Sequence, residues 1–274
     1  MSVFKRAAFL GILFLNLTSA YSQDSSSFFK SFDGTPIYYE VKGTGPAVLL
    51  VHGFIVNGES WKKTAVYTDL ISAGYKVITL DMWGNGKSGK PHTAEAYAND
   101  AEAKDIMGLL KSLRIKKYIA IGYSRGSIIT ARLMVLDPKL KSAVMGGMGT
   151  DFTNPEWPRR LLFYHALRGD SIPELAGVVK YVQDSKLDQE SLALLQKEQP
   201  STSKEKLGNV KIPVLVISGD TDSDNGSAQE LAQLFRNAKY VTVPGDHNHA
   251  HHSKDFSEAV TAFVHEGYQK VKKK

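Results

Sequence analysis

A chain of 274 residues, with 42% hydrophobic residues and no cysteine, is long enough for one large α/β domain or two small ones. The lack of cysteine excludes disulfides, thiol catalysis, cysteine-based metal sites and a lipid anchor on an N-terminal cysteine. The formal net charge is +6, and it falls to a modest value of about +4 without the two basic residues of the first 20. The lysine-rich C-terminal tail is expected to be solvated, so the composition gives no case for nucleic-acid binding.

The N-terminus has the pattern of a secretory signal peptide. Lys5 and Arg6 precede an apolar run at residues 7–17, and Thr18-Ser19-Ala20 then supplies the small residues of a cleavage site. The run is about half the roughly 20 apolar residues that span a bilayer, which favours cleavage over anchoring. We therefore expect residues 1–22 to be removed, leaving a secreted or periplasmic protein without a stable membrane anchor.

The rest of the sequence predicts an α/β fold. After a short serine linker at residues 25–27, residues 28–42 form two extended runs around Asp33-Gly34, which is typical of a hairpin. Apolar, β-branched runs then alternate with helical patterns, as expected for parallel strands that are covered on both faces. Strands are expected at 47–51, 75–80, 118–121, 143–145, 214–217 and 240–243, and helices at 94–113 and 127–136. This order predicts a mostly parallel, doubly wound sheet with an N-terminal antiparallel hairpin.

Residues 149–208 interrupt the alternation, because they contain no convincing strand. Helical patterns occupy residues 158–167, 172–182 and 188–197 instead. We interpret this segment as a helical cap insertion in a core made of residues 28–148 and 209–268. An insertion at the carboxyl ends of strands commonly covers the ligand crevice.

The pentapeptide G-Y-S-R-G at residues 122–126 lies between a predicted strand and a predicted helix. This is the G-x-S-x-G pattern, whose glycines permit a sharp turn that holds the serine hydroxyl clear of the backbone. We therefore predict that Ser124 is a nucleophile. The tripeptide His52-Gly53-Phe54 ends another predicted strand, and the backbone N–H groups of Phe54 and Arg125 are the predicted oxyanion-hole donors.

A carboxylate that orients a histidine is expected at the same edge of the sheet. Asp220, Asp222 and Asp224 follow the predicted strand at 214–217 and compete for this role. Their alternation is similar to the start of a calcium loop, but Asn225 stands where the loop needs glycine and Leu231 where it needs glutamate. Calcium binding is therefore disfavoured.

A histidine cluster follows the last predicted strand. His247 is the expected base, because histidine titrates near neutrality and commonly activates a serine nucleophile. His249, His251 and His252 extend the cluster, and such a group binds zinc or copper in some proteins. Because no cysteine is present and carboxylates would have to be recruited, we favour a catalytic histidine over a metal site.

Together these features resemble the α/β-hydrolase superfamily, in the branch of small capped serine esterases, over residues 28–264. The motifs that carry the resemblance are H-G-F at 52–54 with Trp61, D-M-W-G-N-G-K-S at 81–88, G-Y-S-R-G at 122–126, G-D-T-D at 219–222 and G-D-H at 245–247. The order Ser124, Asp222, His247 is that of the family. The resemblance implies Asp222 as the acid and His247 as the base, with Asp220 and His249 as alternatives.

One residue departs from the family pattern. Trp83 stands where the loop at 81–88 usually carries arginine, so we expect the turn to remain and a local ion pair to be lost. The resemblance also disfavours the activities of superfamily members with an aspartate nucleophile, such as dehalogenases and many epoxide hydrolases, because this chain has Ser124 at that position.

The sequence therefore predicts an exported serine hydrolase that cleaves a small, apolar carboxylic ester through an acyl-enzyme, with no cofactor or metal and with a small acyl substrate as its partner. The same triad serves lactone, thioester, carbon–carbon or peroxyacid chemistry elsewhere, because fold and triad do not fix the reaction. A noncatalytic binding or metal-binding protein on the same scaffold is the alternative from another class.

Overall fold

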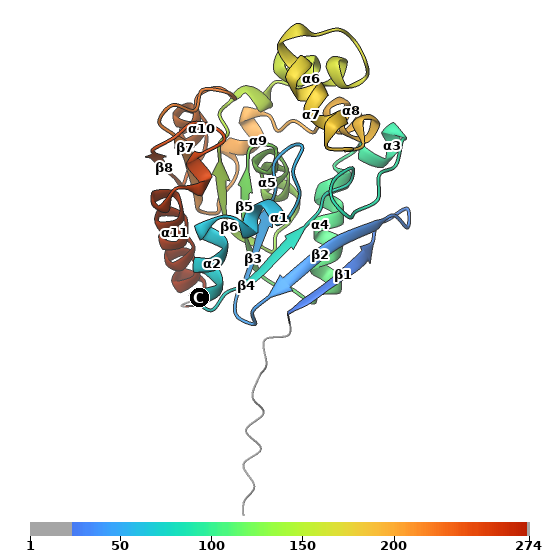
Figure 1. Cartoon of the computed structure of the whole chain (residues 1–274). Coiled ribbons are helices and arrows are strands. Elements are labelled where there is room, and N and C mark those ends of the chain that lie inside the picture. The colour runs from blue at the N-terminus through green and yellow to red at the C-terminus, as the bar shows by residue number, and fades with distance from the viewer. Residues whose placement is uncertain (1–23, 273–274) are drawn as a thin grey trace, which may run out of the picture.

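The computed structural model describes residues 24–272, and the predicted signal peptide lies outside this range (Figure 1). The described residues form an eight-stranded sheet of order β1-β2-β4-β3-β5-β6-β7-β8. The strands are β1 (Ser25–Lys30), β2 (Pro36–Lys42), β3 (Ala47–Val51), β4 (Lys76–Leu80), β5 (Tyr118–Tyr123), β6 (Leu140–Gly146), β7 (Val214–Gly219) and β8 (Ala238–Val243). β2 pairs antiparallel with β1 and β4, and the other pairs are parallel, which confirms the predicted fold class.

The predicted serine linker is wrong. Ser25, Ser26 and Ser27 pair in register with residues of β2 and form the first half of β1. β1 is an edge strand whose residues are mostly exposed, so backbone hydrogen bonding defines it rather than side-chain burial. A pattern of buried apolar residues therefore does not predict a strand at these serines.

The central strands are buried on both faces of the sheet, because their side chains alternate between two layers of helices. In β3, Leu49 and Val51 pack with α4 (Ala101–Ser112) and α5 (Arg125–Leu136), whereas Val48 and Leu50 pack with α2 (Ala65–Ser72) and α11 (Lys254–Lys272). Successive side chains of a strand point to opposite faces, so a continuous apolar run provides both cores. Two further helices complete the core, α1 (Glu59–Lys62) and α10 (Ala228–Leu234).

The helix expected over residues 94–113 is two helices, α3 (Ala94–Tyr97) and α4. Asn99 and Asp100 between them have φ values of 57° and 62°, which a right-handed helix does not allow. The Asp100 carboxylate accepts two hydrogen bonds from Arg132 of α5, at 2.6 and 2.7 Å. A contact distant in sequence thus accompanies the break.

We refer to residues 149–208 as the cap. It contains no strand and consists of α6 (Pro158–Leu167), α7 (Ala176–Asp184), α8 (Gln189–Lys197) and α9 (Lys204–Gly208) with short 3-10 turns. Figure 1 shows α6, α7 and α8 gathered at one end of the core, beyond the sheet. No helix in the described range is both long and apolar enough to cross a bilayer.

Candidate active site

The turn between β5 and α5 places Ser124 in a strained backbone conformation. Its φ is 53° and its ψ is −125°, outside the regions that L-residues commonly occupy. A Cβ on Gly122 would lie 2.3 Å from the Gly126 carbonyl oxygen, and one on Gly126 would lie 2.1 Å from the Val51 carbonyl oxygen. Glycine is therefore required on both sides of Ser124, and the close backbone contacts hold the turn.

Three of the predicted site residues form one hydrogen-bonded chain. The Nε2 atom of His247 lies 2.9 Å from the Ser124 hydroxyl, and its Nδ1 atom lies 3.0 Å from Oδ2 of Asp222. The other carboxylate oxygen of Asp222 accepts the backbone N–H of Asp224 at 3.3 Å. In this arrangement Nδ1 carries the proton that is donated to Asp222, which leaves Nε2 free to accept the serine proton.

The structure places the two alternative residues elsewhere. Asp220 accepts the backbone N–H of Gly245 at 2.9 Å and thereby fixes the turn before His247. His249 binds the carboxylate of Asp246 at 2.7 Å, and its side chain is 77% exposed. Neither residue contacts Ser124.

The predicted oxyanion donors lie on either side of Ser124. Arg125 is the first residue of α5, so its N–H has no acceptor within the helix. A Cβ on Gly53 would lie 3.4 Å from the Ser124 Cβ, which places the loop of Phe54 against Ser124. This arrangement suits two N–H donors for an anion that forms at the acyl carbon.

His52 shapes the loop that carries Phe54. Its ring is buried, with Nδ1 2.7 Å from the Gly53 carbonyl oxygen, while Nε2 accepts the N–H of Met82 at 2.9 Å. Burial lowers the pKa of His52, which keeps the ring neutral. The imidazole thus joins the loops that follow β3 and β4 and has a structural role.

The side chain of Arg125 is buried beside the cavity and is ion-paired. Its guanidinium forms a bidentate ion pair with Glu102 of α4, at 2.8 and 2.6 Å, and also reaches the Leu195 carbonyl oxygen at 3.3 Å. Arg125 and Glu102 are 4% and 5% exposed. One buried ion pair therefore connects the Ser124 turn, α4 and the cap. The sequence allows a carboxylate partner for Arg125 but does not indicate that this partner is Glu102.

Tyr123 supports the loop of the base. Its hydroxyl donates to the His247 carbonyl oxygen at 2.8 Å, and its ring lies 4.3 Å from that of His251, between centroids. Burial, followed by repulsion from the neighbouring histidines, lowers the pKa of His251 to about 4. His251 is therefore neutral near pH 7 and contributes an uncharged surface beside His247.

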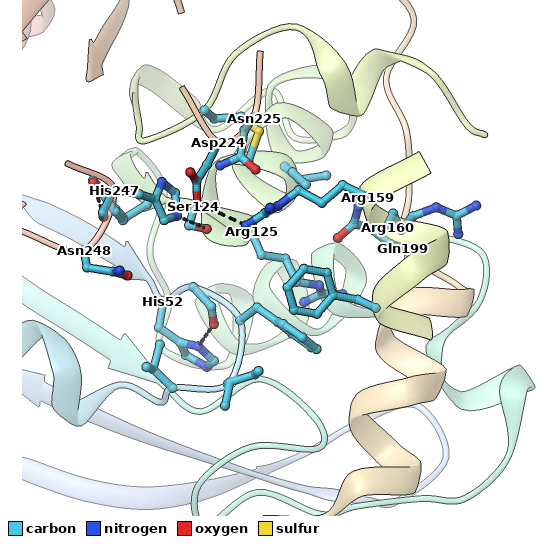
Figure 2. Close-up of a pocket in the computed structure, with 18 of the residues that line it drawn as sticks. His52, Ser124, Arg125, Arg159, Arg160, Gln199, Asp224, Asn225, His247 and Asn248 are labelled. Atoms are coloured by element: carbon cyan, nitrogen blue, oxygen red, sulfur yellow. Dashed lines mark hydrogen bonds and ion pairs between the residues drawn. The ribbon is translucent and has the colours of Figure 1, made fainter. Parts of the chain in front are cut away.

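A cavity of about 380 Å³ opens above Ser124 between the core and the cap (Figure 2). Its apolar lining consists of Phe54, Ile55, Val56, Trp61, Ile128, Met148, Trp157, Phe163 and Val178. Its polar lining includes Ser60, Arg159, Arg160, Gln196, Gln199, Asp224, Asn225 and Asn248. The size suits a small ligand with a substantial apolar part.

The loop at residues 81–88 keeps its turn despite Trp83. The Asp81 carboxylate accepts the backbone N–H groups of Gly58 and Lys87, each at 2.8 Å. Trp83 stacks on Phe32 with centroids 5.5 Å apart, so an aromatic contact occupies the arginine position. Asp105 of α4 lies close by, and burial raises the pKa of its carboxyl to about 7.

Within residues 24–272, no group of three histidine, aspartate or glutamate side chains is arranged to hold a metal ion. The histidines of the predicted cluster take different partners: His247 contacts Ser124, His249 contacts Asp246, and His251 stacks on Tyr123. Of these side chains, His247 is the one that joins a serine and an aspartate in one hydrogen-bonded chain.

A family model described as the alpha/beta hydrolase fold matches residues 46–181. The chain is 32% identical over 114 residues to an epoxide hydrolase from Caballeronia sordidicola and 37% identical over 100 residues to a fluoroacetate dehalogenase from a Burkholderia species. These matches cover 42% and 35% of this chain but only 34% and 32% of the two relatives. The chain thus spans about a third of the length of these relatives.

Solved structures match nearly the whole described chain. A bromoperoxidase from Bacillus anthracis has a TM-score of 0.70 at 24% identity, covering 88% of this chain and 99% of that one. An esterase from Exiguobacterium antarcticum has a TM-score of 0.73 at 18% identity, with coverage of 88% and 99%. At these identities the matches establish the fold. With the family model over residues 46–181, they show that the chain has the α/β-hydrolase fold.

Proposed function

We propose that this protein is an exported serine hydrolase that cleaves carboxylic esters of small, apolar acyl substrates. The observation that carries the proposal is the hydrogen-bonded chain from Ser124 through His247 to Asp222 beneath a largely apolar cavity. The arrangement supplies a nucleophile, a base and an orienting acid in one place. Export follows from the signal-peptide pattern of residues 1–22.

The proposed reaction has two halves. Ser124 attacks the ester carbonyl while His247 takes its proton, and the resulting oxyanion accepts hydrogen bonds from the N–H groups of Phe54 and Arg125. His247 then gives the proton to the departing alcohol, which leaves an acyl-enzyme. Water attacks this acyl group with His247 as base, releasing the acid and restoring Ser124.

Epoxide hydrolysis and dehalogenation, the activities named for the two sequence relatives, are not proposed for this protein. By family resemblance, superfamily epoxide hydrolases and dehalogenases carry aspartate at the position of Ser124. A serine forms an ester with an acyl group and passes it to water, which is the chemistry of ester hydrolysis. The site therefore favours acyl transfer over opening of an epoxide or displacement of a halide.

The test is labelling of the mature protein with a fluorophosphonate, together with hydrolysis of p-nitrophenyl esters of increasing acyl length. Ser124→Ala is expected to abolish labelling and to lower kcat by at least about 10⁴-fold. Ser60→Ala is the matched control, because Ser60 lines the same cavity but bonds the Asn57 carbonyl oxygen instead of a histidine. Absence of labelling in the parent protein, or hydrolysis retained by Ser124→Ala, contradicts the proposal.

A further inference from the structure

The cap contributes a cation to the cavity that contains Ser124. Arg159 of α6 donates from Nη2 to Oδ2 of Asp224 at 3.1 Å, and its guanidinium lies 5.3 Å from the ring centroid of Phe163. Figure 2 shows Arg159 reaching from α6 across the cavity toward Asp224. Asp224 belongs to the loop that also holds Asp222, so the ion pair joins the cap to the core beside the proposed catalytic acid.

The pairing of Arg159 differs from that of the two buried arginines. Arg125 and Arg132 each form two hydrogen bonds to one carboxylate, with their side chains 4% and 9% exposed. Arg159 forms one hydrogen bond to a side chain or backbone oxygen of the described residues, and its side chain is 43% exposed. A guanidinium has five N–H donors in a planar fork that fits a carboxylate. Arg159 therefore retains donors for a second acceptor.

The charge around the cavity favours an anionic acceptor. Arg160 bonds the carbonyl oxygens of Gln196, Lys197 and Pro155 and no carboxylate of the described chain, and its Nε is buried without a partner. Carbonyl oxygens satisfy its donors without neutralising its charge. Glu102 neutralises Arg125. The remaining charged groups of the lining are therefore two cations, Arg159 and Arg160, and one carboxylate, Asp224. The cap side of the cavity is therefore positive.

An apolar path connects the nucleophile to Arg159. The ring of Phe54, whose N–H is a proposed oxyanion donor, meets Phe163 edge to face with centroids 5.8 Å apart. The Arg159 guanidinium lies over that same Phe163 ring. A chain that extends from an acyl carbon at Ser124 along these rings ends at the guanidinium.

We propose that Arg159 determines specificity by binding a carboxylate at the far end of the substrate, so that the preferred esters carry an apolar acyl chain that ends in a carboxylate. This inference rests on the proposed ester hydrolysis. Asp224 competes with the substrate for the same guanidinium and is displaced from one of its donors when the substrate binds. The apolar lining accommodates the chain, and Arg159 recognises its charged end.

The test compares p-nitrophenyl hydrogen glutarate and hydrogen adipate with the neutral p-nitrophenyl pentanoate. The measured quantity is the ratio of kcat/KM for the anionic ester to that for the neutral ester. Arg159→Gln is expected to lower this ratio about tenfold, mainly through KM, because a half-exposed charge-assisted bond is lost. Asp224→Asn is expected to raise it about threefold, because the competing carboxylate is removed.

The control is Arg168→Gln. Arg168 follows α6 and pairs with Asp170, but it does not line the cavity, so its loss should leave the ratio unchanged. A ratio that stays the same in Arg159→Gln overturns the inference, as does a fall of the ratio in Asp224→Asn. These outcomes leave fluorophosphonate labelling of Ser124 intact, which separates them from failure of the proposed function.

A binding measurement tests the inference without turnover. Calorimetry with the dicarboxylate adipate and with neutral pentanamide is carried out on Ser124→Ala and on Ser124→Ala/Arg159→Gln, so that the difference isolates the recognition that depends on Arg159. Adipate is expected to bind more tightly than pentanamide, and this preference should be lost in Ser124→Ala/Arg159→Gln. Equal binding of adipate by the single and the double variant overturns the inference even if no ester is hydrolysed.

Discussion

The two walls of the cavity are held in different ways. The core wall is the end of the sheet, where α5 buries nine of its residues and the glycines at 122 and 126 touch neighbouring backbone. The cap wall is formed mainly by α6 and α7, in which the buried residues are Ala166, Leu167 and Val182, together with the buried side chains of Trp157 and Gln196. The core wall fixes the Ser124 turn through contacts that tolerate little change. The cap wall includes Arg159, whose exposed side chain has spare hydrogen-bond donors.

In the proposed function, the core wall holds the reacting groups and the cap wall recognises the substrate. A nucleophile, its base and its oxyanion donors must be held within a fraction of an ångström, which buried backbone contacts achieve. Recognition of a substrate requires groups that exchange one partner for another, and a half-exposed arginine does this at little cost in stability. Substitutions in the core wall should therefore affect stability strongly, and substitutions in the cap weakly.

The largest effect is expected for Glu102→Gln. The change leaves the buried Arg125 guanidinium without its counter-charge next to Ser124, and loss of one partner of a buried ion pair costs about 3–5 kcal/mol. Chemical denaturation should show this loss in the free energy of unfolding. Glu258→Gln, which removes an exposed partner of Lys254, is the control and should change it by less than about 0.5 kcal/mol.

A second effect in the core depends on pH and involves Asp105. Its carboxyl accepts the Ser31 hydroxyl at 2.5 Å, and no cation of the described residues pairs with it, whereas Glu102 one turn away has Arg125. Burial is the main cause that raises the pKa of Asp105 to about 7. The folded protein therefore holds this proton more tightly than the unfolded chain, in which an aspartate has a pKa of about 3.9.

The sign of the pH effect follows from this linkage. The contribution of Asp105 to the free energy of unfolding should fall as pH rises from about 4 to about 7 and then stay constant. Asp105→Asn removes that fall, so the variant should gain about 2–4 kcal/mol relative to the parent between pH 4 and pH 8. Denaturation at both pH values measures the difference, with Asp184→Asn as an exposed control. A constant difference between parent and variant would show that Asp105 is ionised throughout.

A smaller effect is expected in the cap for Asp188→Ala. Asp188 is the N-cap of α8 and accepts the Ser191 N–H at 2.9 Å. Loss of an N-cap side chain costs about 1 kcal/mol, while Asp188→Asn should retain most of the stability because asparagine is an equally good cap. Thermal unfolding of the two variants tests this. Equal losses in both would point to the ion pair with His92 rather than the cap.

The smallest effect on stability is expected for Arg159→Gln. The pair with Asp224 has side chains 43% and 42% exposed, and such surface pairs contribute about 0.5 kcal/mol or less. The unfolding midpoint of the Arg159→Gln protein should match that of the parent. A loss of more than about 2 kcal/mol in the free energy of unfolding would mean that the pair stabilises the fold as strongly as a buried contact of the core wall. That result would contradict the difference between the two walls.

The sequence by itself determined most of the sheet and the turn that carries Ser124, because both depend on local patterns. Apolar β-branched runs predict buried strands wherever they occur, and the glycines at 122 and 126 are required by a turn only five residues long. The helix predicted over residues 158–167 matches α6 for the same reason, since its spacing and its initial proline are local signals.

Tertiary structure alone decided which charged groups meet. Local pattern left Asp220, Asp222 and Asp224 open, and the family resemblance favoured Asp222; the structure shows its contact with His247, 25 residues away. The pairing of Arg159 with Asp224 spans 65 residues. Glu102 and Asp105 lie on the same helix, yet one meets an arginine and the other a serine. Charged residues show no periodicity that reveals a distant partner, because their energies depend on burial and on the groups that folding brings to them.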